Sequence, residues 1–431
     1  MPEVLIHTLG CKLNSLESES YADSFRRAGY ELFIKQKINS KPAVVIINTC
    51  TVTSKADQKA RRVIRKALRD YPKAKIIVTG CYAELEKEGI EKLLTAENSN
   101  SGLLVLKREE VLNFFNDNNQ SSKFQFVPEQ FSVHTRSILK IQDGCNNKCT
   151  YCRIRLARGP SESLPAEQVL ERLLLLEQTY AEAVLTGVNI SQYSSMSLHP
   201  SCENLTKLLS YLIAGTQKIA LRLSSLDPLF ITKDFAKSVS GNRIRPHFHL
   251  SIQSCSQIVL QRMGRSYNAN IIENAVSFLR GVKDDPFIAC DIITGFPGET
   301  EAEFNKTYEL CKKLQFAWIH VFPYSKRPGT PAFDFSDTVQ ESEVTRRVQL
   351  LTELAWHGRA EYVKKQLGKE VEVLIENSVK SCRGVSANYL KVLVKYKGKT
   401  PPPSGAVLRC RLPADQKIDC KNEYDAIALE I

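Results

Sequence analysis

The chain has 431 residues, enough for about three domains, so a mini-protein held together by disulfides or metals is excluded. Hydrophobic residues make up 43% and charged residues 25%, which excludes a disordered or fibrous chain. The net charge of +12 suits an anionic partner such as nucleic acid. No apolar run reaches the roughly 18 to 20 residues of a membrane span, and no signal peptide is recognisable, so we expect a cytoplasmic protein without membrane contact.

Residues 1–125 are predicted to form an open, parallel α/β sheet. Short β-branched runs alternate with helical stretches there, which is typical of βαβ units. The expected strands cover 4–9, 43–48 and 75–79, and the expected helices cover 15–28, 54–70 and 84–94. Residues 116–122 are rich in Asn and Ser and predict a loop at the domain boundary.

Residues 135–366 are predicted to form a partial (β/α)6 barrel, followed by a small β-barrel over 367–431. Parallel barrels place their functional groups in the loops that follow the strands. The six expected barrel strands cover 137–142, 183–186, 220–223, 247–252, 287–294 and 318–324. A long amphipathic helix over 339–367 leads to tail strands at 371–375, 389–394 and 406–412. The predicted fold class is therefore α/β with a β-rich tail.

Three cysteines, Cys145, Cys149 and Cys152, lie in one loop directly after the first predicted barrel strand. Their C-x3-C-x2-C spacing suits a cubane iron–sulfur cluster that takes three thiolates and leaves its fourth iron open. A structural zinc would require four ligands, and a redox dithiol needs only two cysteines. In a reducing compartment, such clustering indicates metal or redox chemistry rather than disulfides.

Three further cysteines, Cys11, Cys50 and Cys81, each follow one of the predicted N-terminal strands. Turns that follow parallel strands crowd at one edge of the sheet, so these cysteines can converge in space. Gly10 and Gly80 precede two of them and permit tight turns. We therefore expect a second three-thiolate cluster; the alternative is that each cysteine is a buried small apolar residue.

The cysteine loop, with Tyr151 before its last cysteine, resembles the signature of radical S-adenosylmethionine enzymes. The strings T-L-G-C-K-L-N from Thr8, N-T-C-T-V-T from Asn48 and T-G-C from Thr79 resemble the N-terminal domain of methylthiotransferases within that group. The β-rich tail is similar to a TRAM domain, so the resemblance spans nearly the whole chain. Among methylthiotransferases, these strings resemble the enzymes that act on threonylcarbamoyladenosine in tRNA.

The resemblance implies insertion of a methylthio group at C2 of threonylcarbamoyladenosine (t6A to ms2t6A) at tRNA position 37. Acid–base chemistry alone cannot replace that C–H bond, so a radical cofactor supplies the hard step. The barrel cluster would generate the radical, and the N-terminal cluster would carry the sulfur that a second S-adenosylmethionine methylates. The implied cofactors are two [4Fe–4S] clusters and S-adenosyl-L-methionine. The implied partners are the tRNA anticodon loop, a flavodoxin or ferredoxin electron donor, and a sulfur source.

The resemblance also implies contacts to S-adenosylmethionine in the loops after successive barrel strands. The turns after the second and third strands correspond to contacts with the methionine amino group and the ribose, and a later turn lies beside the adenine. The alternative for each segment is an ordinary strand-to-helix turn. The implied cofactor-binding residues are Tyr151, Gly187, Asn189, Ser224, Ser225, Gln253 and Gly295.

Two basic regions are predicted to contact RNA. The helix after Cys50 carries seven cations, including Arg61 and Arg65, enough for several phosphate contacts if they face one side. In the tail, Arg383 can meet a phosphate and Tyr389 can stack on a base. For the helix, a solvated face is the alternative.

Two other functions compete with this prediction. The first keeps the radical chemistry but acts on isopentenyladenosine 37 or on a ribosomal-protein aspartate. The second is a non-catalytic RNA-binding protein whose cysteines hold zinc. It predicts no iron and no cleavage of S-adenosylmethionine under reduction.

Overall fold

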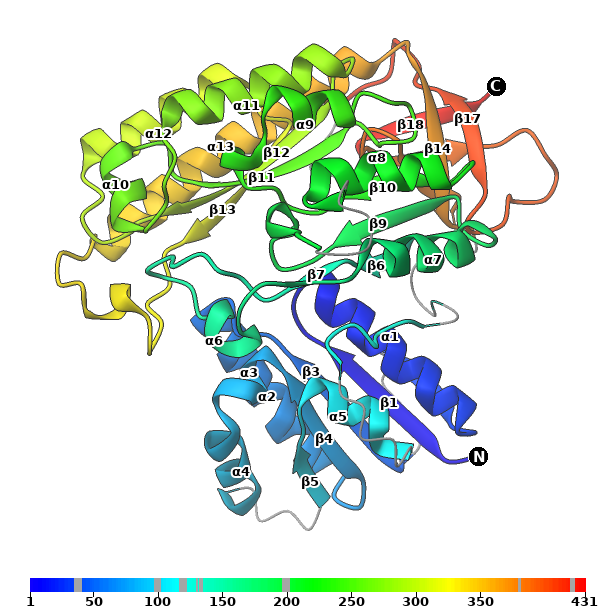
Figure 1. Cartoon of the computed structure of the whole chain (residues 1–431), viewed down its shortest axis with the longest axis vertical. Coiled ribbons are helices and arrows are strands. Elements are labelled where there is room, and N and C mark those ends of the chain that lie inside the picture. The colour runs from blue at the N-terminus through cyan, green and yellow to red at the C-terminus, as the bar shows by residue number, and fades with distance from the viewer. Residues whose placement is uncertain are drawn as a thin grey trace.

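Figure 1 shows the computed structural model, in which the N-terminal sheet lies below a central barrel and the C-terminal strands lie at the upper right. The structure describes residues 1–34, 41–96, 102–115, 122–128, 131, 135–195, 202–378, 381–418 and 423–431. Most of the loop expected at 116–122 lies outside the described residues.

The N-terminal part is a five-stranded parallel sheet in the order β2-β1-β3-β4-β5. Its strands are β1 (Glu3–Thr8), β2 (Glu31–Ile34), β3 (Val44–Thr49), β4 (Lys75–Gly80) and β5 (Gly102–Val105). Its helices are α1 (Lys12–Arg27), α2 (Ser54–Asp70), α3 (Cys81–Leu85), α4 (Lys87–Ala96) and α5 (Arg108–Leu112), followed by η1 (Asn113–Phe115). The short edge strands β2 and β5 were not predicted.

Alternation along the strands explains how this sheet buries both faces. Val45 and Ile47 of β3 pack with apolar residues of α2, whereas Val44 and Ile46 pack with apolar residues of α1. All six residues of β3 are buried, as expected for a central parallel strand. The sheet is therefore covered on both faces. Its carboxyl edge is left uncovered by these helices, and the turns that carry functional residues lie there.

The central part is a partial barrel of six parallel strands, as predicted. They are β6 (Ser137–Lys140), β9 (Glu182–Thr186), β10 (Ala220–Leu223), β11 (His247–Gln253), β12 (Phe287–Thr294) and β13 (Trp318–Pro323). They form two three-stranded sheets, β6-β9-β10 and β11-β12-β13. Isolated bridges from Leu221 to Ile244 and from Leu226 to Leu250 join these sheets between β10 and β11.

Helices and short elements complete the barrel. The longer helices are α7 (Ala166–Glu177), α8 (Leu205–Gly215), α11 (Ala269–Val282), α12 (Glu301–Leu314) and α13 (Glu341–Gln366). The shorter elements are β7 (Gln142–Asp143), α6 (Ile154–Arg158), β8 (Glu162–Ser163), η2 (Ile190–Gln192), η4 (Pro228–Phe230), α9 (Lys233–Ser238), α10 (Gln257–Arg262) and η5 (Pro331–Asp334).

Strand β11 shows which side chains face the inside of the barrel. Phe248, Leu250 and Ile252 are buried in the apolar core, so the alternate residues His249 and Gln253 face the barrel interior.

The C-terminal part is a closed barrel in the order β14-β15-β16-β18-β17. Its strands are β14 (Glu370–Asn377), β15 (Arg383–Ser386), β16 (Lys391–Lys395), β17 (Val407–Arg411) and β18 (Ala426–Glu430). Of these, β15 and β18 were not predicted. The structure confirms the predicted α/β class with its small β-rich tail.

A buried ion group connects the two halves of the central barrel. Glu182 of β9 accepts hydrogen bonds from Nε of Arg222 at 2.7 Å and from Nε of Arg245 at 2.9 Å. Arg245 also pairs with Glu372 of the C-terminal barrel at 2.6 Å. Burial opposes ionisation of Glu182, but Arg222 and Arg245 outweigh it and hold the pKa of this carboxyl below its usual range.

We predict that Glu182→Gln destabilises the central barrel by about 3 kcal/mol at pH 7, because two buried guanidinium groups lose their counter-charge. Urea unfolding followed by tryptophan fluorescence measures this, since Trp318 and Trp356 both lie in this part of the chain. The half-buried Glu273, which pairs with the exposed Lys313, supplies the control Glu273→Gln, expected to cost under about 1 kcal/mol.

The difference in stability between wild type and Glu182→Gln depends on pH. Because the folded-state pKa of Glu182 is lowered, its contribution is complete above the unfolded value of about 4.3. It is lost as the pH falls through the folded-state pKa. The stability difference between wild type and Glu182→Gln must therefore shrink at low pH; a constant difference would contradict this account.

Candidate functional site

A cavity of about 300 Å³ lies at the carboxyl ends of the barrel strands, where the barrel meets the N-terminal sheet. All three cysteines of the predicted radical loop line it. The other side is lined by the segment that follows Cys50, which comprises Thr51, Val52 and Thr53. The structure therefore brings a segment from each cysteine set to one space.

Backbone hydrogen bonds hold the loop of Cys145, Cys149 and Cys152 in place. The amide of Cys145 donates to the Gly159 carbonyl at 3.1 Å, and the amide of Thr150 donates to Met263 at 3.0 Å. Gly144 has a φ of 70°, and a Cβ there would lie 1.8 Å from the Pro160 carbonyl oxygen, so only glycine fits.

Burial and hydrogen bonding act on two of the three thiols of this loop, those of Cys145 and Cys152. Burial raises the pKa of Cys152 to about 12, so its sulfur carries a proton at neutral pH unless a metal replaces it. The Ile154 amide donates to the Cys152 sulfur at 3.4 Å, and the Asn189 side chain hydrogen bonds to Cys145. Such donors stabilise the charge on sulfur in iron–sulfur sites.

Arg265 is a site residue that the sequence analysis missed. Its Nη1 lies 3.4 Å from the Cys149 sulfur, and its Nη2 lies 2.9 Å from the Ser251 carbonyl and 3.2 Å from Asp227. Gly264, with a φ of 71°, allows this segment to approach the cysteine loop, since a Cβ would lie 2.9 Å from the Lys148 carbonyl oxygen. No local sequence pattern marks Arg265, because this contact joins residues 116 positions apart.

A hydrogen-bonded line of three side chains borders the same cavity. Ser225 Oγ lies 3.1 Å from His249 Nδ1, and His249 Nε2 lies 2.8 Å from Asp291 Oδ1. Ser225 and Asp291 line the cavity, as does Gln253, which has a φ of 67°. Asp291 fixes the orientation of the imidazole, and the imidazole fixes that of the Ser225 hydroxyl.

Four of the seven predicted cofactor residues, Tyr151, Asn189, Ser225 and Gln253, line the cavity. The other three are packed behind it. A Cβ on Gly187 would lie 2.7 Å from Gln142 Oε1, and a Cβ on Gly295 would lie 2.4 Å from Val344, so both glycines permit close packing. Ser224 is buried, and its hydroxyl has no hydrogen-bond partner among the described residues. Cofactor contact by these seven residues stays a prediction.

The N-terminal cysteines converge at the carboxyl edge of their sheet. Cys11 precedes α1, Cys50 follows β3 and Cys81 begins α3. A Cβ on Gly10 would lie 3.1 Å from the Cys50 sulfur, which shows how closely the first two turns approach. Burial is the main cause that raises the pKa of Cys50 to about 12, and the neighbouring Cys11 and Cys81 raise it further.

The donor sets fit clusters better than single ions. Zinc binds sulfur at about 2.3 Å, so its ligands crowd around one point, whereas a cubane spreads its thiolates over separate irons. Among the residues that the structure describes, no three His, Cys, Asp or Glu side chains are grouped to hold one metal ion. Each set nevertheless supplies three neighbouring thiols that influence one another electrostatically.

The predicted RNA-binding residues lie in two places. On α2, Arg65 is exposed, whereas Arg61 is half-buried and donates to the Tyr82 hydroxyl at 3.0 Å. In the C-terminal barrel, Arg383 pairs with Glu423 at 2.6 Å. The Tyr389 ring stacks on His247 at 3.9 Å between centroids, so the predicted stacking of a base competes with a contact to the central barrel.

Comparison with known proteins identifies the family. Residues 139–311 match the radical SAM superfamily, and residues 3–101 match the uncharacterized protein family UPF0004. The threonylcarbamoyladenosine tRNA methylthiotransferase MtaB of Treponema pallidum is 36% identical, with 96% of this chain and 98% of the relative aligned. The enzyme of the same name from Thermotoga maritima is 36% identical, with 92% and 91% aligned. The chain belongs to the radical SAM methylthiotransferase family.

A more distant relative and a solved structure are also similar to this chain. A tRNA-2-methylthio-N(6)-dimethylallyladenosine synthase of Corynebacterium diphtheriae is 29% identical, with 86% of this chain and 75% of the relative aligned. The radical S-adenosylmethionine methyltransferase TsrM from Kitasatospora setae has a TM-score of 0.53 at 13% identity, covering 77% of each chain. This structure shares the fold.

Family membership makes the protein an enzyme that uses radical chemistry. The family implies a [4Fe–4S] cluster and S-adenosylmethionine, and the loop of Cys145, Cys149 and Cys152 fits that cluster. In the described part of the chain, none of the helices combines the length and the apolar character that membrane crossing requires.

We predict that Arg265→Gln slows reductive cleavage of S-adenosylmethionine by about 10- to 100-fold, because the Cys149 thiolate loses its neighbouring cation. The measurement is the rate of 5′-deoxyadenosine release at equal iron content. Arg262→Gln is the matched control, since that side chain pairs with Asp337 at 2.7 Å instead. Wild-type cleavage by the Arg265 variant would refute the assignment.

Proposed function

We propose that the protein inserts a methylthio group at C2 of threonylcarbamoyladenosine 37 in the tRNA anticodon loop. Two relatives with that name are 36% identical over nearly the whole chain. The observation that carries the proposal is the shared cavity, in which Cys145, Cys149 and Cys152 face the segment after Cys50. The residues of both cysteine sets would therefore present their cofactors to one substrate atom in this cavity.

The two cysteine sets have separate tasks in this proposal. When bound, the cluster at Cys145, Cys149 and Cys152 supplies the electron that cleaves S-adenosylmethionine. Cys11, Cys50 and Cys81 would hold a second [4Fe–4S] cluster, which would supply the sulfur. Cys11 keeps accessible surface while Cys50 and Cys81 are buried, so the site opens on the side of Cys11.

The residues around the cavity bind and orient the cofactor and the base. Arg265 and the Asn189 side chain stabilise negative charge on the cysteine loop. The Ser225 hydroxyl, aligned by His249 and Asp291, is held in one orientation for hydrogen bonding to the cofactor. Tyr151 packs edge-on against Phe296, with 6.3 Å between ring centroids, and encloses the apolar side.

Lys12 favours threonylcarbamoyladenosine over the isopentenyl nucleoside. It follows Cys11, is exposed, and forms no hydrogen bond or ion pair with any described residue. Arg222 and Arg136 also lie within its electrostatic range, but they are paired with Glu182 and Glu376. Lys12 is therefore the cation that can meet the carboxylate of a threonyl group, and it offers nothing to an isopentenyl chain.

The tRNA approaches along α2 in this proposal. The helix begins at Ser54, directly after the segment that lines the cavity, so its exposed cations extend outward from the site. These cations are Lys55, Lys59, Arg62, Arg65, Lys66 and Arg69. Such a row can neutralise successive phosphates beside the target base. A cytoplasmic location, a flavodoxin or ferredoxin electron donor and a separate sulfur source belong to the same proposal.

The product decides between the candidate substrates. Nucleosides from tRNA of a strain that lacks methylthiotransferases and expresses this protein are digested and analysed by mass spectrometry. The proposal expects the methylthio form of threonylcarbamoyladenosine. A methylthio mark on isopentenyladenosine, or on a ribosomal-protein aspartate, would refute it.

We predict that Cys149→Ala abolishes S-adenosylmethionine cleavage, whereas Cys50→Ala retains it but stops methylthio transfer. The reason is that each variant loses one ligand of a different cluster. Release of 5′-deoxyadenosine and formation of the modified nucleoside are measured together with iron content. Loss of cleavage in a folded Cys50→Ala protein with an intact barrel cluster would refute the division of tasks.

We predict that Lys12→Gln lowers methylthio transfer to threonylcarbamoyladenosine at least about 10-fold, because a charge-assisted bond to the carboxylate is worth about 1.5–3 kcal/mol. Reductive cleavage of S-adenosylmethionine should remain. The exposed Lys55→Gln on α2 is the control for general loss of tRNA affinity. Equal loss in both variants would remove the specific role of Lys12.

A further inference from the structure

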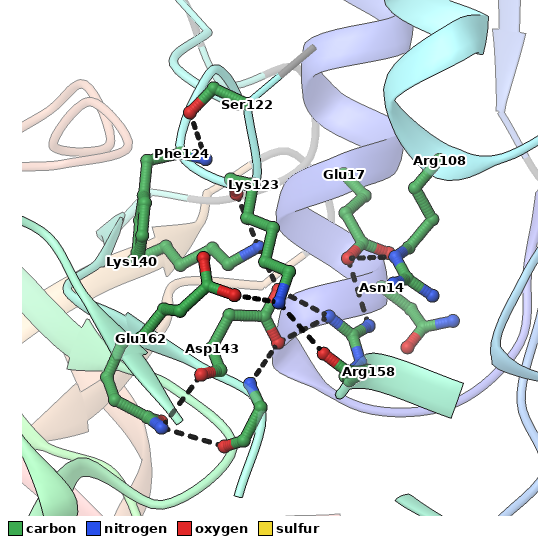
Figure 2. Close-up of polar contacts among 12 residues, drawn as sticks. Asn14, Glu17, Arg108, Ser122, Lys123, Phe124, Lys140, Asp143, Arg158 and Glu162 are labelled. Carbon is green, nitrogen blue, oxygen red and sulfur yellow. Dashed lines mark hydrogen bonds and ion pairs between the residues drawn. The ribbon is translucent and has the colours of Figure 1, made fainter. Parts of the chain in front are cut away.

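A buried ion network joins α1 of the N-terminal sheet to the start of the cysteine loop. Figure 2 shows Arg158 of α6 between Glu17 of α1 and Asp143 of β7. Arg158 Nη1 lies 3.2 Å from both oxygens of Asp143, and Nη2 lies 2.9 Å from Glu17. Lys140 Nζ lies 2.5 Å from Asp143, and Arg108 Nε lies 3.9 Å from Glu17.

The network carries more positive than negative charge. Three cations, Arg108, Lys140 and Arg158, face two carboxylates, Glu17 and Asp143, and the exposure of all five side chains is 5% or less. Burial opposes ionisation of Asp143, but Arg158 and Lys140 hold its pKa well below the usual range. The network therefore contains one more basic than acidic side chain, and an unbalanced buried charge is costly.

The negative charge that would balance the network can be placed beside Cys81. Arg158 Nε donates to the Cys81 sulfur at 3.2 Å, so all three types of nitrogen on this guanidinium are engaged. An oxidised cubane with a 2+ core and three thiolates carries a net charge of about −1. The network thus balances a cluster held by Cys11, Cys50 and Cys81.

We infer that Arg158 is the positioning residue of the second cluster and raises its reduction potential. This inference rests on the proposed function, which supplies the cluster. A hydrogen bond and a positive charge at a ligand sulfur stabilise the reduced, more negative state of a cluster. Loss of Arg158 therefore lowers the potential of this cluster.

Arg158 also ties the second cluster to the barrel cysteine loop. Asp143, which it contacts, accepts a hydrogen bond from the Gly144 amide at 2.7 Å, and Cys145 follows Gly144. The same guanidinium therefore touches a ligand of one cluster and the residue that fixes the first ligand loop of the other. Its rigid fork suits this bridging better than a lysine ammonium does.

The test measures the potential of the second cluster alone. The full-length chain with Cys145, Cys149 and Cys152 replaced by Ala is reconstituted with iron and sulfide, and EPR follows a redox titration. Arg158→Lys keeps the charge, and the double variant E17Q/R158Q removes one charge of each sign, so the net charge of the network is preserved. Arg155→Gln is the control, an exposed arginine on the same helix.

The expected result is a shift to more negative potential in E17Q/R158Q, a smaller shift in Arg158→Lys, and the parent value in Arg155→Gln. Loss of iron from E17Q/R158Q, with an unchanged circular dichroism spectrum, also supports a positioning role. A folded E17Q/R158Q protein with full iron and the parent potential overturns the inference. A parent protein that binds no iron overturns the second cluster of the proposed function instead.

Discussion

The ion network around Arg158 is the constraint on which the site depends, because it sets how the N-terminal sheet meets the barrel. The guanidinium reaches a cysteine of the sheet, a carboxylate of α1 and a carboxylate of the barrel. A second arginine, Arg327, makes a parallel connection by donating to Thr51 and Asp57 of the N-terminal part at 2.7 and 2.6 Å. Buried ion pairs of this kind add little net stability but fix geometry, since any other arrangement leaves a charge unpaired.

The site follows from two parallel sheets whose carboxyl edges face each other. Each sheet places its functional turns at that edge, so neither part forms the cavity alone. The N-terminal sheet contributes the segment after Cys50, and the barrel contributes the loop of Cys145, Cys149 and Cys152. The cavity between them has a volume of about 300 Å³ and is lined by residues of both parts.

Much of the fold was readable from the sequence, because buried parallel strands and the turns after them have strong local patterns. The barrel strands β10 and β12 and the helix α2 were predicted to the residue. The edge strands β2 and β5 were missed, since four partly exposed residues carry too weak a pattern. In the site, the barrel cysteines were predicted from their spacing and the N-terminal cysteines from their positions after successive strands. Arg158 and Arg265 were not assigned because their partners lie 77 and 116 positions away.

The central barrel consists of two three-stranded sheets that meet along a seam between β10 and β11. Ladders of backbone hydrogen bonds join β6, β9 and β10 on one side and β11, β12 and β13 on the other, whereas at the seam between β10 and β11 the described residues form isolated bridges. The ion group of Glu182, Arg222 and Arg245 fastens the seam at one end of the strands. A change in the angle between the two three-stranded sheets would alter the curvature of the cavity wall without breaking a ladder. The width available to a bulky base therefore depends on the seam between the sheets rather than on the strands themselves.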